Sequence, residues 1–282
     1  MKKWMYGALI IFFSLMFLIS AGFLADYFIK SRKQAAQFDD LSSLVAEIQQ
    51  QTLPKENPSN NTNQQNSSGD LLTLPESAYM TVTHPETGEE LRILREYAPI
   101  FQKNPDLVGW IKIEGTKLNY PVMQTIDNPN YYLNRDFYGN YSNHGCIYVS
   151  EACDVGAPSD NLTIYGHKMK DNSMFAMLHD YADEDFYKKH PIITFDTLTE
   201  HHTYEILSVF TTTASVGEGF HYHEFVNASS AAEFDVFVGR CKDLAMYDTG
   251  VDADYGDKLI TLSTCEYSQV NGRLVVVAKR IG

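Results

Sequence analysis

The most informative stretch of this chain reads Thr261-Leu262-Ser263-Thr264-Cys265 and closes a β-branched run that begins at Leu259. Such a run predicts a strand with the cysteine at its end. Arg273 follows eight residues after this cysteine, on the next expected strand. A thiol at a strand end, with an arginine on the neighbouring strand, is a candidate nucleophile beside a fixed cation.

A second motif lies upstream in Asn161-Leu162-Thr163-Ile164-Tyr165-Gly166-His167, where an apolar strand ends in a turn that leaves an imidazole at its rim. A thiol attacks well only as the thiolate, so it needs a base or a cation nearby. His167 could take the thiol proton and return it to a departing amine, and Arg273 could stabilise an oxyanion. Together, Cys265, His167 and Arg273 predict an acyl-transfer site.

The rest of the chain alternates short strand-like runs with polar turns, which predicts a closed or nearly closed barrel. Three helices are expected between these runs: Leu91–Gln102, Met174–Asp180 behind a Ser173 cap, and Ser230–Met246. The last begins with Ser230 and Glu233 as a capping box, and its expected buried stripe is Phe234, Phe237, Val238, Cys241 and Ala245. The expected strands are Val108–Ile113, Leu118–Met123, Gly145–Val149, Asn161–Tyr165, Ile192–Phe195, Tyr204–Thr213, Lys258–Thr264 and Leu274–Lys279.

The N-terminal segment is apolar, with no charged residue from Trp4 to Ala25. A run of this length can cross a hydrocarbon core of about 30 Å, whereas the apolar region of a cleaved signal peptide usually has about 7–15 residues. Asp39 or Asp40 is expected to cap a following amphipathic helix, and Gln49–Asp70 reads as a flexible polar tether. The predicted division is 1–29 membrane anchor, 30–75 juxtamembrane helix and linker, and 76–282 catalytic domain.

Composition excludes one class of partner and leaves others open. The formal net charge is -14 across 282 residues, and no basic stripe offsets it, so nucleic acid is not expected. His201-His202 and His221-x-His223 are close pairs without a recognisable ligand pattern, so no metal is expected. Four cysteines leave one disulfide possible, with a pairing that the sequence does not determine.

These motifs resemble those of the sortases, the cysteine transpeptidases of Gram-positive bacterial surfaces. The TLxTC signature with its downstream arginine matches Thr261–Cys265 and Arg273, and the family's histidine matches His167. The likeness runs from about Leu91 to Arg280 and is similar to class B in the segments Asn104–Trp110 and Tyr131–Leu133. It also includes a long helical insert before the cysteine strand.

The resemblance implies a mainly β fold with flanking helices: a closed eight-stranded barrel, an N-terminal helical region and a long helix before the cysteine strand. It implies substrate contacts from Asn128, Leu133, Ser263 and Glu266, although the register of Asp127–Asn130 leaves the first of these open by one or two residues. The resemblance also implies that the catalytic domain lies outside the cell. The sequence alone does not decide the orientation, because the positive charges on the two sides of the apolar span nearly balance.

The activity implied by the resemblance is cleavage after threonine in a C-terminal sorting motif, of NPxT type or related, through a thioacyl enzyme. The implied partners are secreted surface proteins and an amine acceptor from a peptidoglycan precursor or a pilus subunit. No cofactor is implied, because exchange of a peptide for a thioester and then for an amide needs no external energy source.

A cysteine protease remains open as an enzymatic rival, which only the dependence of the products on an acceptor amine would separate from a transpeptidase. Two further interpretations also remain open. Asn143-His144-Gly145-Cys146 contains a triplet that also marks the L,D-transpeptidases, which would make Cys146 the nucleophile. That family expects an asparagine or arginine two residues after the cysteine, where Tyr148 stands here. It also expects a second histidine some fifteen to twenty residues upstream, but no histidine lies between His84 and His144. The second alternative is a membrane-tethered binding module without activity, which would require the loss of a catalytic position.

Overall fold

The computed structural model describes residues 2–52, 74–215, 217–268 and 270–282. The chain divides into two compact units, Met1–Asp40 and Leu41–Gly282. The predicted polar tether, Gln49–Asp70, lies outside the described residues from position 53 onward.

One continuous helix, α1 (Lys2–Thr52), carries the apolar N-terminal segment. It is long enough to cross a membrane, and an 18-residue window of it has a mean hydropathy of 2.5. The expectation of a second helix capped at Asp39 or Asp40 is wrong, because α1 passes through both residues without a break. Leu41 and Val45, which belong to the second unit, are buried. The apolar spacing that predicted a new helix therefore marks the buried face of the same one.

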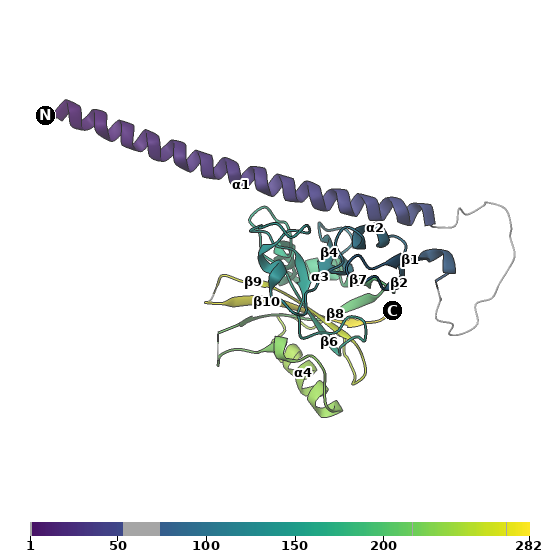
Figure 1. Ribbon diagram of the computed structural model, residues 1–282. Helices are drawn as coiled ribbons and strands as arrows, with labels where there is room; N and C mark the ends of the chain where they lie inside the picture. The colour runs from purple at the N-terminus through teal and green to yellow at the C-terminus, as the bar shows by residue number, and fades with distance from the viewer. Residues whose placement is uncertain (1, 53–73, 216, 269) are drawn as a thin grey trace. The chain divides into compact units, whose positions relative to one another are not determined.

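The second unit is built on a closed barrel of eight strands in the order β10-β8-β7-β3-β4-β5-β6-β9 (Figure 1). All eight expected strands are confirmed, with small changes at their ends. Their apolar and β-branched residues are typical of strands, and β6 and β9 are buried on both faces over almost their whole length. The strands are β3 Leu107–Lys112, β4 Asn119–Met123, β5 Ile147–Val149, β6 Asn161–Tyr165, β7 Ile192–Thr197, β8 Thr203–Thr213, β9 Leu259–Cys265 and β10 Gly272–Arg280.

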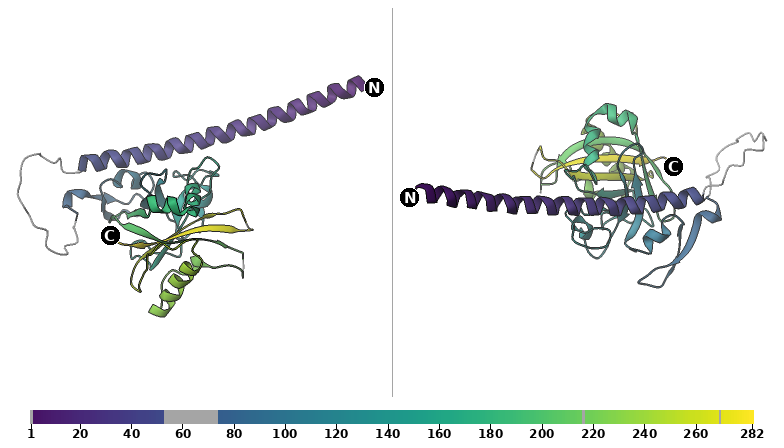
Figure 2. Two further views of the ribbon diagram at one scale, coloured as in Figure 1. Left: turned by 180° about the vertical axis from the view of Figure 1, so that it is seen from behind. Right: turned by 90° about the horizontal axis from the view of Figure 1, so that it is seen from above.

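Two pairings in this barrel are parallel, β4 with β5 and β6 with β9, and the others are antiparallel. Parallel strands end at the same edge of a sheet. The β6–β9 pair places Tyr165 opposite Ser263, so the residues that follow both positions emerge together. The antiparallel neighbour β10 runs beside β9 (Figure 2) and returns Arg273 to a position opposite Cys265.

The expected helix Leu91–Gln102 is wrong over most of its length. Residues of β2 (Glu90–Leu94) pair with β1 (Tyr79–Thr83) in a two-stranded sheet, and only α2 (Ala98–Phe101) is helical. The spacing of Leu91, Leu94, Ala98 and Phe101 imitates a helical face, but the hairpin partner upstream provides hydrogen bonds that periodicity does not reveal.

The expected helix Met174–Asp180 is also wrong in type and cap. The segment forms a 3₁₀ helix, η3 (Ala176–Ala182), with no side-chain cap. The Ser173 hydroxyl instead donates to Asp171 at 2.6 Å. The remaining short elements are η1 Glu76–Ala78, η2 Tyr131–Asn134, α3 Glu184–Lys189 and η4 Tyr222–Glu224.

The helix before the cysteine strand is α4 (Ala231–Asp243), on the outside of the barrel (Figure 1). The Ser230 cap is confirmed, since its hydroxyl accepts the Glu233 amide at 3.3 Å, while the Glu233 carboxylate accepts the Ser229 amide at 2.8 Å. The helix ends before Ala245, which is only half-buried. Its buried stripe is Phe234, Phe237, Val238 and Cys241, and it packs on a core that includes Phe210, Leu259 and Val275.

Candidate active site

The ends of β6 and β9 bring the histidine motif and the cysteine motif to one rim of the barrel. The Gly166 amide donates to the Ser263 carbonyl at 3.2 Å, which extends the parallel pairing one residue beyond Tyr165. His167 and Cys265 each lie two positions after the paired residues Tyr165 and Ser263. Their proximity therefore follows from the parallel register, because both strands end at the same edge.

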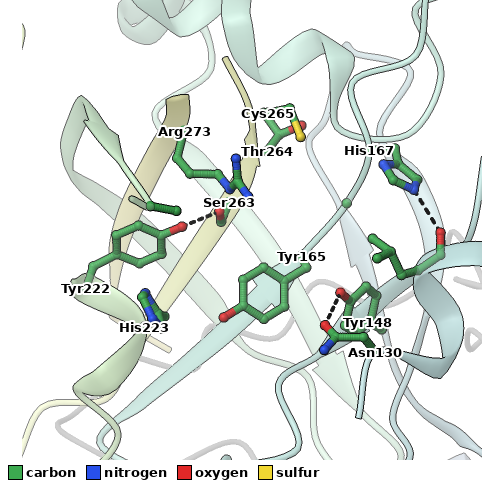
Figure 3. A pocket seen from close by; sticks show the side chains of 13 residues that line it. Asn130, Tyr148, Tyr165, His167, Tyr222, His223, Ser263, Thr264, Cys265 and Arg273 are labelled. Carbon is green, nitrogen blue, oxygen red and sulfur yellow. Dashed lines mark hydrogen bonds between the residues drawn. The ribbon is translucent and has the colours of Figure 1, made fainter. Parts of the chain in front are cut away.

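A pocket of about 260 Å³ opens at this rim (Figure 3). Three residues expected to be catalytic, His167, Cys265 and Arg273, all line it, and so do Leu133 and Ser263. Its other lining residues are Asn130, Tyr148, Tyr165, Gly166, Ala214, Tyr222, His223 and Thr264. The wall thus draws on several strands of the barrel and on the loops that join them.

Two residues expected at the substrate wall do not line this pocket. Asn128 is exposed and its carbonyl accepts the Thr125 hydroxyl at 2.8 Å, whereas Asn130, two positions later, does line the pocket. The Asn130 side-chain oxygen accepts the Tyr148 hydroxyl at 2.9 Å. The Glu266 carboxylate is turned to the backbone amide of Ser268 at 2.8 Å.

Arg273 faces Cys265 across the β9–β10 pair. Its Nη1 donates to the carbonyls of Asn271 at 3.3 Å and Gly272 at 3.0 Å. These bonds fix Nη1 of the guanidinium to the backbone of the turn before β10. Nη2 and Nε have no hydrogen bond within the part of the chain that the structure describes. A planar cation held in this way can offer its other donors to a carbonyl oxygen in the pocket.

The hydrogen bond of His167 determines which nitrogen carries its proton when the ring is neutral. Nε2 lies 2.8 Å from the carbonyl oxygen of Leu133. A carbonyl only accepts, so Nε2 is the donor and Nδ1 holds the lone pair. Figure 3 shows this second nitrogen on the side of the ring nearer Cys265. Nδ1 is therefore the nitrogen available for proton exchange in the pocket.

Gly145 allows the Leu133 carbonyl to take this position. Its φ of +60° lies in the left-handed region, and a Cβ there would stand 2.5 Å from the Leu133 oxygen and 2.6 Å from the Tyr132 oxygen. Real Cβ atoms essentially never approach within 3.0 Å of such atoms. The amide of Cys146 completes the contact by donating to the Tyr132 carbonyl at 2.9 Å. The glycine of the His-Gly-Cys triplet thus has a structural role beside His167.

Gly166 has a comparable role on the other side of the histidine. A Cβ at Gly166 would lie 2.6 Å from the ring of Phe175, so only glycine permits this packing. The amide of Phe175 donates to the His167 carbonyl at 3.0 Å. The ring and the amide together hold the Tyr165-Gly166-His167 turn in place.

His179 links the cysteine strand to the histidine loop, and the sequence contained no signal for it. Lys168 Nζ lies 3.2 Å from His179 Nδ1, and His179 Nε2 lies 2.9 Å from the Cys265 carbonyl. The lysine can only donate and the carbonyl can only accept, so the ring is neutral with its proton on Nε2. Burial first, and then Lys168, lowers the pKa of His179, which agrees with this state.

Tyr222, in the segment between β8 and α4, is a further residue in the pocket lining. It belongs to η4, is buried, and its hydroxyl lies 2.5 Å from the Ser263 hydroxyl. This bond connects the β8–α4 segment to β9 inside the pocket. The neighbouring Thr264 Oγ1 is buried with no hydrogen-bond partner among the described residues, so it is available to a ligand.

The other cysteines are poor nucleophiles by position. All four cysteines are free, and only Cys265 is not fully buried. Burial raises the pKa of the thiols of Cys146, Cys153 and Cys241. A thiol that is buried and protonated attacks poorly. The geometry therefore argues against Cys146 as the nucleophile of an L,D-transpeptidase.

Comparison with known proteins gives one consistent result. The family model for the Sortase domain matches residues 111–281. Sortase B of Staphylococcus aureus (strain NCTC 8325 / PS 47) is 37% identical over 180 residues, covering 63% of this chain and 71% of that protein. A solved Staphylococcus aureus sortase B–substrate complex has a TM-score of 0.69 at 27% identity and covers 90% of this chain and 98% of that one. A solved sortase B complexed with triglycine has a TM-score of 0.68 at 27% identity, covering 89% and 99%. The chain therefore belongs to the sortase family of cysteine transpeptidases, and within it to class B.

Proposed function

We propose that this protein cleaves a C-terminal sorting motif after threonine, through a thioacyl enzyme on Cys265, and transfers the surface protein to an amine. The observation that carries this proposal is that Cys265, His167 and Arg273 line one pocket at the ends of three neighbouring strands. Support for the two substrates comes from similar proteins, since one solved sortase B is a substrate complex and another is complexed with triglycine.

In the first half-reaction, Cys265 Sγ attacks the threonine carbonyl and its proton passes to His167 Nδ1. Negative charge develops on the carbonyl oxygen, where the free donors of Arg273 stabilise it. The tetrahedral species collapses when the C–N bond breaks, and His167 returns the proton to the leaving amine. The product is a thioester between Cys265 and the threonine.

In the second half-reaction, an amine attacks the thioester carbonyl and gives up a proton to His167. Arg273 again stabilises the oxyanion, and the C–S bond breaks as an amide forms. His167 then returns its proton to the Cys265 sulfur, so the enzyme is regenerated. We infer that the acceptor is an amine of a peptidoglycan precursor or of a pilus subunit.

We assign the substrate wall to Leu133 and Ser263, with Asn130 in the place expected for Asn128. Asn130 lines the pocket and accepts the Tyr148 hydroxyl, whereas Asn128 does not line it. Glu266 directly follows the nucleophile and bonds to Ser268, so we keep it as a contact at the outer rim. The preferred motif is of NPxT type or a related sequence.

We further propose that residues 1–29 anchor the protein in the cell membrane by a single pass and that the catalytic domain, 76–282, is extracellular. The length and apolar composition of the first part of α1 support the anchor. Protease added to intact protoplasts should remove the domain. Protection of the domain would place it inside the cell and rule out a role in surface anchoring.

The central test uses Cys265→Ala with Cys241→Ala as the matched control. The first variant should lose both peptide cleavage and the thioacyl adduct, and the second should retain turnover. Mass spectrometry of enzyme trapped with an NPxT-type peptide should find the adduct on Cys265, and triglycine added at the start should compete with water for the thioester, so that transfer product forms in place of hydrolysis product. An adduct on Cys146, or products that do not respond to triglycine, would contradict the proposal.

A further inference from the structure

Three possible metal ligands lie together at the edge of the active-site pocket. One nitrogen each of His221 and His223 and one carboxylate oxygen of Glu224 all lie within 4.8 Å of one another. They sit on and beside η4, between β8 and α4. His223 lines the same pocket as Cys265 and stands next to Tyr222 (Figure 3). His223 therefore joins the cluster to the active-site pocket, whereas His221 and Glu224 line a neighbouring groove beside α4.

The hydrogen bonds of His221 require either a proton or a metal ion between it and Glu224. Nε2 of His221 lies 2.9 Å from the Glu218 carbonyl, which can only accept, so Nε2 carries a proton. Nδ1 then faces the Glu224 Oε1 at 3.1 Å. A nitrogen lone pair and a carboxylate oxygen repel each other at this distance. Either a proton or a metal ion must lie between them.

This arrangement also has the supporting contact that histidine ligands usually have. A metal-bound histidine nearly always donates its other N–H to a carbonyl or a carboxylate, which fixes its tautomer, and His221 does so toward Glu218. Zinc holds nitrogen and oxygen at about 2.0–2.2 Å, so tetrahedral neighbours stand about 3.3–3.6 Å apart. His221 Nδ1 and Glu224 Oε1 lie 3.1 Å apart, so the exposed Glu224 side chain has to move by only a few tenths of an ångström to take the ion.

We propose that His221, His223 and Glu224 form a Zn²⁺ site that inhibits the enzyme when occupied. Two imidazoles and one carboxylate suit zinc and leave its fourth position to water. His223 offers the third ligand atom, a ring nitrogen within 4.8 Å of the other two. The ion holds the His223 side chain at the pocket wall and adds its own water there. The inhibitory effect rests on the proposed function, but the binding of zinc does not.

The binding test uses the full chain in detergent with Cys265→Ala as background, because the thiol is itself a zinc ligand. Titration calorimetry with ZnCl₂ should show one ion per chain. Adding His221→Gln, His223→Gln or Glu224→Gln should weaken the affinity at least about tenfold. Adding His84→Gln, a histidine at the β1–β2 turn, should leave it unchanged. Glu224 has an exposed side chain, so its variant should fold normally.

Two results would overturn the site. Affinity that falls equally with His84→Gln, or does not fall with any of the three variants, would leave only a protonated His221–Glu224 ion pair and adventitious zinc. As an activity readout, zinc should raise the KM of the enzyme for the peptide, and Glu224→Gln should need at least about tenfold more zinc for the same effect. Zinc binding without any transfer activity would refute the proposed function and leave the site intact.

Discussion

Gly145→Ala is the sharpest test of the orientation of His167. The alanine must adopt a φ near +60°, which costs about 1–2 kcal/mol for a residue with a Cβ. Its Cβ would begin 2.5 Å from the Leu133 oxygen and must reach at least 3.0 Å. The oxygen that accepts His167 Nε2 therefore has to retreat by about half an ångström, which is enough to spoil a 2.8 Å hydrogen bond.

The expected loss of rate follows from the charge of His167 during the reaction. Hydrogen bonds to charged groups contribute about 1.5–3 kcal/mol, and His167 is an imidazolium when it holds the thiol proton. Each factor of ten in rate corresponds to about 1.4 kcal/mol, so kcat should fall about ten- to a hundredfold. The assay is cleavage of a fluorogenic sorting peptide at about 25 °C, with the Tm measured by circular dichroism on the same sample.

Gly88→Ala is the matched control for this variant. Gly88 has a φ of +74°, and a Cβ there meets nothing within 4 Å. It carries the same backbone cost without the steric contact, so it should lose stability and keep its kcat. If the two alanine variants are both folded at the assay temperature and their kcat values agree within about twofold, the Leu133 carbonyl does not orient His167.

The other predictions concern charge and position at three sites. Arg273→Lys keeps the charge but loses the planar donor pair, so kcat should fall about 10²–10³; retention of more than about a third of the activity would make Arg273 a diffuse charge only. Hydrogen bonds to Asp196 and then to Glu96 raise the pKa of His201 to about 10, so its charge stabilises the fold fully below pH 6.5 and progressively less as the pH rises toward 10. The Tm should fall by at least about 3 °C between about pH 7 and pH 10, and less in His201→Gln; equal slopes would refute this. His179→Ala should lower kcat about three- to tenfold with little change in KM, and His179→Gln, which keeps a donor, should restore most of it; a change confined to Tm would make His179 merely structural.

The local sequence pattern was sufficient to predict the eight barrel strands and the helix before the cysteine strand. Short runs of apolar and β-branched residues mark β6 and β9, because both strands are buried on both faces over almost their whole length. The Ser230 cap of α4 depends on residues a single turn apart, and it is present as expected. The pattern gave a wrong prediction at β2, which was expected to be helical, because the hydrogen bonds of this strand come from another segment, β1.

The residues of the candidate site also fall into two groups, those predicted from local sequence and those that only the folded structure reveals. The sequence by itself predicted Cys265, His167 and Arg273 as a nucleophile, a base and a fixed cation, from residue type and spacing at strand ends, and the structure places all three in the lining of one pocket. It also marked the apolar span of α1, since the length needed to cross a membrane is a local property.

Only the tertiary structure decided which other residues complete the pocket. His179 bonds to Cys265 across 86 positions, and Tyr222 bonds to Ser263 across 41. The preference for Asn130 over Asn128 depends on a left-handed turn at Asn130, which determines the residue that faces the pocket. Periodicity reports how each strand meets the core, whereas contacts between distant segments depend on the register in which strands pair, and that register is selected by the packing of the whole barrel.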